Sequence, residues 1–172
     1  MKTRSITLVN PSLRWEATYA KHKRNLLKMI DGKIEVSIEH IGATALKDSI
    51  TRPFVDLAVG LVNELDLITL RDLLARRGLK YAPKVSSADD IVMVKWDGPK
   101  SVEYVVHIVP IFSEIWQRMI CFKNYLIVHP EKVVEFNELK KKLSYEEKVG
   151  PKEYRERKLE FIKEVCKPLL KK

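Results

Sequence analysis

The sequence predicts an α+β (α/β) fold, in which a mixed β-sheet is flanked by helices and followed by a helical C-terminal extension. Short apolar runs with strand periodicity lie in the first two thirds of the 172 residues, and stretches with helical periodicity separate them. Beyond residue 111 only helical patterns follow. We therefore expect a single domain spanning 1–172, with the mixed sheet and its helices in about 1–111 and the helical extension in about 112–172.

The first segments predict a strand followed by a helix. Ser5–Val9 has the composition of a short strand, and Asn10 and Pro11 supply an N-cap and a first helical position. The helix that follows should end at Asp31-Gly32-Lys33. Its large apolar side chains recur at helical spacing and predict one face turned to a core: Trp15, Tyr19, Leu26 and Ile30.

Four further strands are predicted before residue 111. Lys33–His40 alternates apolar and polar residues, which is typical of a half-buried strand, and Phe54–Leu61 is the most apolar stretch and predicts a central strand. A loop with a short helix should join them. Ile91–Trp96 and Val102–Val109 should pair as a hairpin, because Asp97-Gly98-Pro99-Lys100 between them has turn chemistry.

The remaining segments predict helices. Asn63 can cap a helix over Glu64–Arg77, which Gly78 should end. In the last third, three helices are predicted: Phe112–Val128, a second from Pro130 to about Leu143, and a third from Pro151 towards Leu170. Two finer signals lie there: capping-box spacing at Ser144–Glu147, and a stripe on the last helix made of Tyr154, Lys158, Phe161, Val165 and Leu169.

The composition favours a cytoplasmic protein with an anionic ligand. The basic N-terminus lacks a signal-peptide core, and the apolar stretches are too short to span a bilayer, so we expect no membrane association. Cys121 and Cys166 form no Cys-x-x-Cys motif, so neither a zinc knuckle nor a disulfide framework is indicated. The net charge of +9 suits a nucleotide, an acidic metabolite or nucleic acid. Lys and Glu alternate along the last third, however, which is typical of a solvated helix surface.

The segments around Gly42 and Asp56 carry the chemistry. A predicted strand ends in His40 and is followed by Gly42, Ala43 and Thr44, whose small side chains would let a phosphate approach backbone N–H groups. Asp56 lies in an apolar strand, where a bare carboxylate is costly to bury. It must be paired, hydrogen-bonded, bound to a cation or exposed at a cleft, and Arg52 is a candidate partner or phosphate contact. A structural acid and an ordinary turn would give the same pattern.

These segments resemble the signature of the GrpB family, in which Ile-Glu-His-Ile-Gly-Ser-Thr precedes a Lys-Pro-Ile-Ile-Asp strand. The resemblance continues along nearly the whole chain, in Asn10–Trp15, Val106–Val109, Phe122–Leu126, His129-Pro130 and Tyr154–Phe161. It implies a nucleotidyltransferase-like fold of the DNA polymerase beta-like superfamily.

The superfamily pattern is a Gly-Gly or Gly-Ser pair, a spacer, and then two acids separated by one residue. The spacer from Ala43 to Asp56 has the expected length, but Ala43 replaces the usual Ser and Ala58 stands where the second acid would be. Active nucleotidyltransferases hold Mg²⁺ with both acids, which share one strand face. GrpB members generally also have an apolar residue at that second position.

The resemblance implies the following roles. Asp56, His40 and His107 are the candidate catalytic residues, and Asp56 is the candidate ligand of one divalent cation, expected to be Mg²⁺. His107 would serve as a ligand or as an acid/base, although imidazole suits transition metals better than Mg²⁺. Tyr154 is either a phenolic group in the cleft or a core residue. The candidate cofactor-binding residues are Gly42, Ala43, Thr44, Arg52, Lys123 and Lys158.

Three functions are compatible with these features. The first is nucleotidyl transfer, with a nucleoside triphosphate over the 42–44 loop and one divalent ion at Asp56. The alternative, favoured by Ala58, is a non-catalytic module that binds a nucleotide, a coenzyme A-like molecule or another phosphorylated small molecule. The third is weak nucleic-acid binding through the net positive charge. The sequence sets neither the substrate nor the oligomeric state.

Overall fold

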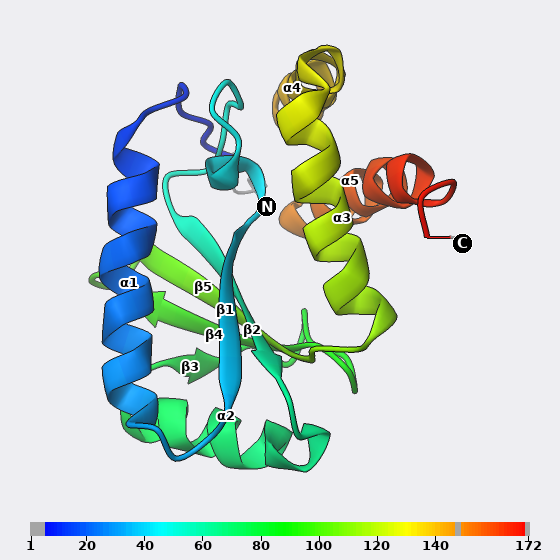
Figure 1. Cartoon of the computed structure of the whole chain (residues 1–172). Coiled ribbons are helices and arrows are strands. Elements are labelled where there is room, and N and C mark those ends of the chain that lie inside the picture. Colours follow the sequence, from blue (N-terminus) through cyan, green and yellow to red (C-terminus); the bar gives the residue numbers. More distant parts are fainter. Residues whose placement is uncertain (1–5, 147–148, 171–172) are drawn as a thin grey trace.

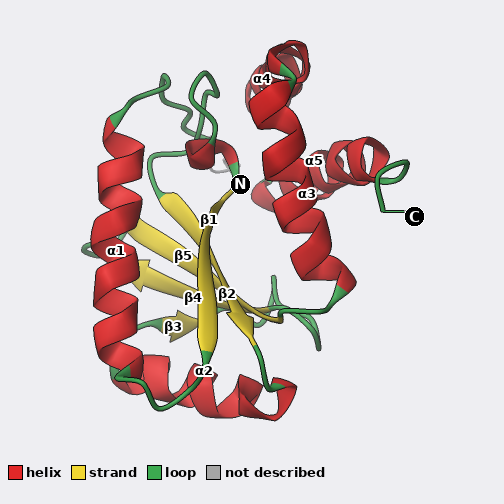
Figure 2. Cartoon of the chain, in the orientation of Figure 1, coloured by secondary structure: helices red, strands yellow, loops and turns green. Residues whose placement is uncertain are grey.

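A five-stranded mixed sheet forms the centre of the protein (Figures 1 and 2). The computed structural model describes residues 6–146 and 149–170. The strands lie in the order β1-β2-β5-β4-β3, and only β2 and β5 are parallel neighbours. Their bounds are β1 Val36–Ile41, β2 Val55–Leu61, β3 Lys80–Tyr81, β4 Ile91–Trp96 and β5 Val102–Pro110.

Helices cover the sheet unequally on its two sides (Figure 1). α1 (Arg14–Ile30) and α2 (Leu67–Arg76) pack on one face. α3 (Glu114–Val128) contacts β1, β2 and β5, and packs with α4 (Pro130–Tyr145) and α5 (Pro151–Cys166) in a separate apolar cluster. Across the part of the chain that the structure describes, no helix is both long enough and apolar enough to cross a membrane.

Strand alternation divides β2 into a core side and an open side. Val55, Leu57, Val59 and Leu61 belong to the main core with α1 and α2. Because successive side chains point to opposite faces, Asp56, Ala58 and Gly60 face the other way, towards α3. The parallel register places Val105 beside Asp56 and His107 beside Ala58. The candidate acid and His107 therefore share the face that the C-terminal helices partly cover.

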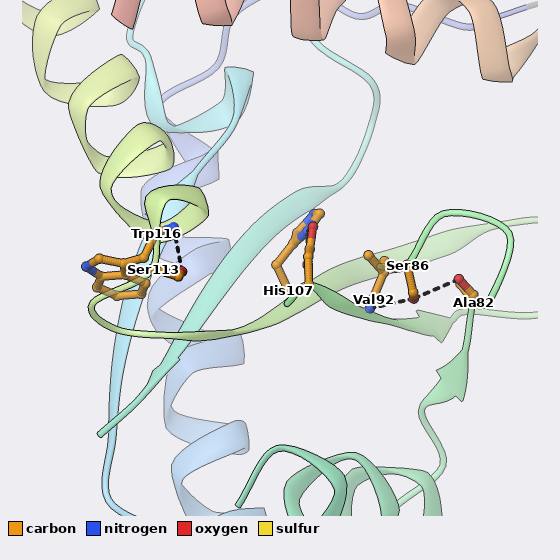
Figure 3. A network of polar contacts seen from close by, with 7 residues as sticks. Ala82, Ser86, Val92, His107, Ser113 and Trp116 are labelled. Atoms are coloured by element: carbon orange, nitrogen blue, oxygen red, sulfur yellow. Dashed lines mark hydrogen bonds and ion pairs between the residues drawn. The ribbon is translucent and has the colours of Figure 1, made fainter. Parts of the chain in front are cut away.

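The seating of α3 depends on the missing side chain of Gly60. A Cβ atom at this position would lie 2.7 Å from Cζ3 and 2.9 Å from Cη2 of Trp116, near the start of α3. Ser113 caps this helix by accepting a hydrogen bond from the Trp116 backbone N–H at 3.2 Å (Figure 3). The cap and the indole together fix where the helical extension leaves the sheet.

The N-terminal predictions need two corrections. The strand predicted at Ser5–Val9 is wrong: Val9 forms only an isolated antiparallel bridge with Thr51, and Ser5 lies outside the described residues. The first helix begins at Arg14, with Leu13 in the cap position, and not directly after Asn10. The two backbone bonds between Val9 and Thr51, at 2.7 and 3.0 Å, hold the chain extended before the helix can begin.

The other predicted elements agree with the structure, apart from details near the C-terminus. Asn63 accepts a hydrogen bond from the Leu65 backbone N–H at 3.2 Å, as a cap should, although the first turn is a 3₁₀ helix. Ser144 lies inside α4, which continues to Tyr145, so it does not cap a following helix, and Glu147, the other member of the predicted capping box, lies outside the described residues. α5 ends at Cys166, so Leu169, which is 41% exposed, is not on its stripe. The two-residue β3 was not predicted.

Gly60→Ala should destabilise the fold by about 1–3 kcal/mol, because the added methyl overlaps the Trp116 indole in a packed interface. The measurement is the free energy of unfolding from denaturant titration. Trp116→Leu in the Gly60→Ala background should recover part of the loss, because it removes the overlapping ring. Equal stability of Gly60→Ala and wild type would contradict this account of how α3 is seated.

Candidate functional site

The bend after β1 lies directly against the Asp56 carboxylate. Gly42 has φ 72° and ψ −168°, a backbone conformation that residues with a side chain rarely adopt. A Cβ atom there would lie 2.8 Å from Oδ2 of Asp56. The antiparallel register pairs Ile41 with Asp56, so the acid lies beside the residue that leads into the bend. Glycine is therefore required at position 42 for two independent reasons.

The Asp56 side chain is half-buried and unpaired among the residues that the structure describes. Within residues 6–146 and 149–170, its carboxylate takes part in no hydrogen bond and no ion pair. Because an unpaired carboxylate is costly to desolvate, the arrangement favours an exposed edge that a cation or a polar ligand can reach.

His40 supports the bend from the opposite side of the sheet. It stacks on Tyr19 of α1 at a centroid distance of 4.5 Å, and its Nε2 lies 2.9 Å from Oγ1 of Thr44. Burial lowers the pKa of His40 to about 4, the attraction of Asp56 opposes this, and Lys123 lowers the pKa further. His40 is therefore neutral near pH 7, and its contacts hold Thr44 and the bend in place.

His107 lies on the same face as Asp56 but is already paired. Its Nδ1 is 3.0 and 3.1 Å from the two carboxylate oxygens of Asp90, which immediately precedes β4. Burial alone would lower the pKa of His107, but the charge and hydrogen bond of Asp90, with help from Asp56, raise it above 6.5. The carboxylate of Asp90 thus favours the protonated form of the histidine.

The loop that carries Asp90 is fixed by Ser86. Its hydroxyl donates to the Ala82 carbonyl and accepts from the Val92 backbone N–H, each at 2.9 Å, beside His107 (Figure 3). Val92 is the register partner of His107 across β4 and β5. The ion pair is therefore anchored at both ends by the sheet.

The residues present do not supply the two-carboxylate site that the superfamily pattern expects. Ala58 is fully buried, and its neighbour across the register is His107. In the part of the chain that the structure describes, no group of three His, Cys, Asp or Glu side chains is placed to hold a metal ion. At the bend, Asp56 offers carboxylate oxygens that no described residue engages.

Two cations lie close to Asp56. Burial lowers the pKa of Lys158, on α5, to about 8; the charge of Arg52 lowers it further and that of Asp56 opposes this. The Arg52 guanidinium stacks on Phe54 with Cζ 4.5 Å from the ring centroid, and Lys158 Nζ lies 4.9 Å from the ring centroid of Tyr154. Within the described residues neither cation has an ion-pair partner.

Two other predicted residues are engaged elsewhere. The Lys123 ammonium donates to Oε2 of Glu39 at 2.7 Å, which joins α3 to β1. Tyr154 is buried beside Leu143 and Val149, and burial raises the pKa of its phenol to about 12. Of the two interpretations of Tyr154, the structure supports the core residue.

Two cavities lie away from the bend. One of about 780 Å³ opens at the carboxyl ends of β2 and β5, where Glu64, Asp89 and Glu114 line it. Another of about 210 Å³ lies between the 46–48 segment and the junction of α3 and α4. Asp56 lines neither of these two cavities.

Sequence reasoning missed Asp90, Asn137 and Lys140. Asp90 belongs to the pair Asp89-Asp90 before a strand, which resembles ordinary turn chemistry. Lys140 opens a run of three lysines on a helix, and such a run is typical of a solvated surface. Only the tertiary structure shows that Lys140 is 1% exposed, so the sequence offered no signal for it.

The strand order and the glycine bend facing a strand acid define a nucleotidyltransferase-like fold. The structure of the Cid1 poly(U) polymerase with MgGTP bound matches with a TM-score of 0.52 and 10% identity, covering 76% of this chain and 42% of that one. The likeness at this identity concerns the fold alone.

The chain belongs to the GrpB family, since the model of the GrpB protein family matches residues 5–168. The glutamate-rich protein GrpB of Alkalihalophilus pseudofirmus is 26% identical over 163 residues, which cover 93% of each chain. The crystal structure of the conserved protein GrpB from Enterococcus faecalis matches with a TM-score of 0.77 and 21% identity, over 95% of this chain and 99% of that one.

Gly42→Ala should destabilise the protein by about 2–3 kcal/mol, because a side chain is strained in this conformation and also meets Asp56 Oδ2. Gly32→Ala is the control: its φ is also positive, at 64°, but nothing lies within 4 Å of the added Cβ. Denaturant unfolding should show a larger loss for Gly42→Ala, and Asp56→Ala in that background should recover part of it. Equal losses for both single variants would rule out the contact with Asp56.

The folded protein should become less stable as the pH is lowered, because of His40. The folded pKa of about 4 lies below the ordinary 6.5, so the unfolded chain takes up a proton as pH drops below 6.5 while the folded chain does not. Between pH 7 and pH 5, wild type should lose about 1–2 kcal/mol more than His40→Gln. Paired unfolding curves of both proteins at the two pH values make the test, and parallel losses would show that His40 titrates normally.

Proposed function

We propose that the site binds the phosphate groups of a nucleotide or another phosphorylated small molecule between the Gly42 bend and the cations Arg52 and Lys158. The observation that carries this proposal is the pair of cations itself. They lie close enough for the charge of Arg52 to lower the pKa of Lys158, and the negative charge of Asp56 raises that pKa. Two neighbouring, partly buried cations with one shared acid leave a positive field that a phosphate group would neutralise.

The pair of His107 and Asp90 borders this field without competing for the ligand. Asp90 contacts the imidazole from the side of β4, while the open face of the sheet carries Asp56. The paired Lys123 and Glu39 close the neighbouring edge, at β1. The site is therefore cationic around one available acid, which suits a ligand with several negative charges better than a bare metal ion.

Nucleotidyl transfer is the second candidate, and the unpaired Asp56 carboxylate favours it. Asp56 faces the bend in a fold shared with a polymerase whose structure has MgGTP bound. Asp56 is the residue that would hold one Mg²⁺, but the second carboxylate of the superfamily pattern is replaced by Ala58. Ligand binding that needs no divalent ion is thus the function that the residues support best. For nucleic acid, no feature of the described surface goes beyond the net charge.

Arg52→Gln and Lys158→Gln should each weaken nucleotide binding about tenfold or more, because each removes a charged contact to phosphate. Isothermal titration calorimetry with ATP, ADP, AMP and adenosine, in EDTA and again in Mg²⁺, measures this. Adenosine should not bind, and affinity should persist in EDTA. Lys132→Gln is the matched control, because Lys132 is paired with Glu135 at a distance of 2.8 Å on the surface of α4.

The outcomes separate the candidates. Nucleotide affinity that both Gln variants leave intact, or that adenosine shares, would refute the phosphate site. Binding that appears only with Mg²⁺ and vanishes in Asp56→Asn would instead support the metal-dependent transfer candidate. Release of pyrophosphate from ATP during incubation would then be the sign of transfer.

A further inference from the structure

Lys140 of α4 is a buried lysine that reaches into the segment leading to the site. It is 1% exposed, and its ammonium donates hydrogen bonds to Oγ of Ser49, at 2.6 Å, and to the carbonyl oxygen of Ile50. Both acceptors belong to the connection between β1 and β2, some ninety residues earlier in the chain. A lysine so far from water normally indicates a specific role, because an ammonium loses its hydration there.

Asn137, one turn earlier on the same face of α4, holds the same segment. Its Oδ1 accepts from the Ile50 backbone N–H at 3.0 Å, and its Nδ2 donates to the Asp48 carbonyl at 2.9 Å. On the far side, Thr51 pairs with Val9 through two backbone bonds. Residues 48–51 are thus clamped from two directions, and Arg52 is the next residue along the chain.

Packing alone does not explain the lysine. Burial lowers the pKa of Lys140 to about 7, and the nearby charge of Lys158 lowers it further. The surroundings in the folded protein therefore disfavour the charged ammonium. The ammonium lies 4.4 Å from the ring centroid of Phe136, in apolar surroundings that an uncharged side chain of similar length would fill without desolvation. What such a side chain would lose is the pair of bonds to Ser49 and Ile50.

We propose that Lys140 is a positioning residue for the phosphate site, and that it acts by fixing residues 48–51 so that Arg52 is held towards the ligand. The ammonium is enclosed, and Ser49 and Ile50 occupy two of its three donors, so it does not contact the ligand itself. This inference rests on the proposed function, because it assigns Lys140 its effect through Arg52.

A double-mutant cycle tests the proposal, with ADP as the probe in isothermal titration calorimetry. Lys140→Met should weaken ADP binding about tenfold, because Arg52 is no longer held in place. Lys140→Met with Arg52→Gln should bind no more weakly than Arg52→Gln alone. Lys141→Met is the control: it makes the same substitution on the adjacent residue, whose contact is the surface pair with Glu138, and should leave affinity unchanged. Additive losses, or unchanged affinity in Lys140→Met, would overturn the proposal.

Amide hydrogen exchange provides a readout that does not need a ligand. In Lys140→Met, the Ile50 and Thr51 amides should exchange about tenfold faster or more, while the amides of β2 keep their protection. Asn137→Ala removes the acceptor of the Ile50 N–H itself and sets the exchange rate expected when the clamp is open. Ser49→Ala removes one acceptor of the Lys140 ammonium and serves as the test if Lys140→Met does not fold. If wild type binds no ADP, the proposed function fails, and exchange still decides whether Lys140 holds the segment. Unchanged exchange at Ile50 in Lys140→Met, or in Ser49→Ala where Lys140→Met does not fold, would show that it does not.

Discussion

The contact between the Gly42 bend and the Asp56 carboxylate constrains everything around it. The antiparallel register of β1 and β2 brings Ile41 opposite Asp56, so the chain must turn away from the sheet at the next residue, directly against the acid. A residue with a side chain would overlap Oδ2, and the positive φ excludes most alternatives. The turn then projects residues 43–54 beyond the sheet edge, where that segment has to be held by something other than strand pairing. His40 and Thr44 hold its beginning, and α4 holds its end.

The charges around this contact follow a consistent logic. The position that would carry a second acid is Ala58, and the register places His107 beside it, paired with Asp90 just before β4. A second carboxylate at 58 would have created a pair of like charges, which a bound cation or a proton stabilises. Instead the protein places Arg52 and Lys158 near the remaining acid, so positive charge is built into the chain itself. The fold of a nucleotidyltransferase is thereby retained with a different distribution of charge.

Sequence periodicity predicted most of the sheet and helices because their cores are built from regular apolar patterns, as in β2 and the hairpin of β4 and β5. It failed where tertiary contacts override local signals: Val9 is held by Thr51 and not by a strand partner, and Ser144 ends a helix instead of capping the next one. The bend and Asp56 were visible in sequence because glycine and a lone acid in an apolar run are locally unusual. The partners Asp90, Asn137 and Lys140 were not, because their residue types are ordinary at those positions and only distant contacts give them a role.

The C-terminal helices are best understood as part of the site and not as an appendage. α3 is seated by Trp116 over Gly60 and tied to β1 by Lys123, α4 clamps the segment before Arg52, and α5 brings Lys158 towards Asp56. Each of these contacts joins residues far apart in sequence, so the electrostatics at the bend exist only when the helices are docked on the sheet. Loss of any one helix would therefore alter the charges that face Asp56 even if the sheet stayed folded. The division near residue 111 separates two kinds of secondary structure, whereas the charges around the bend come from both.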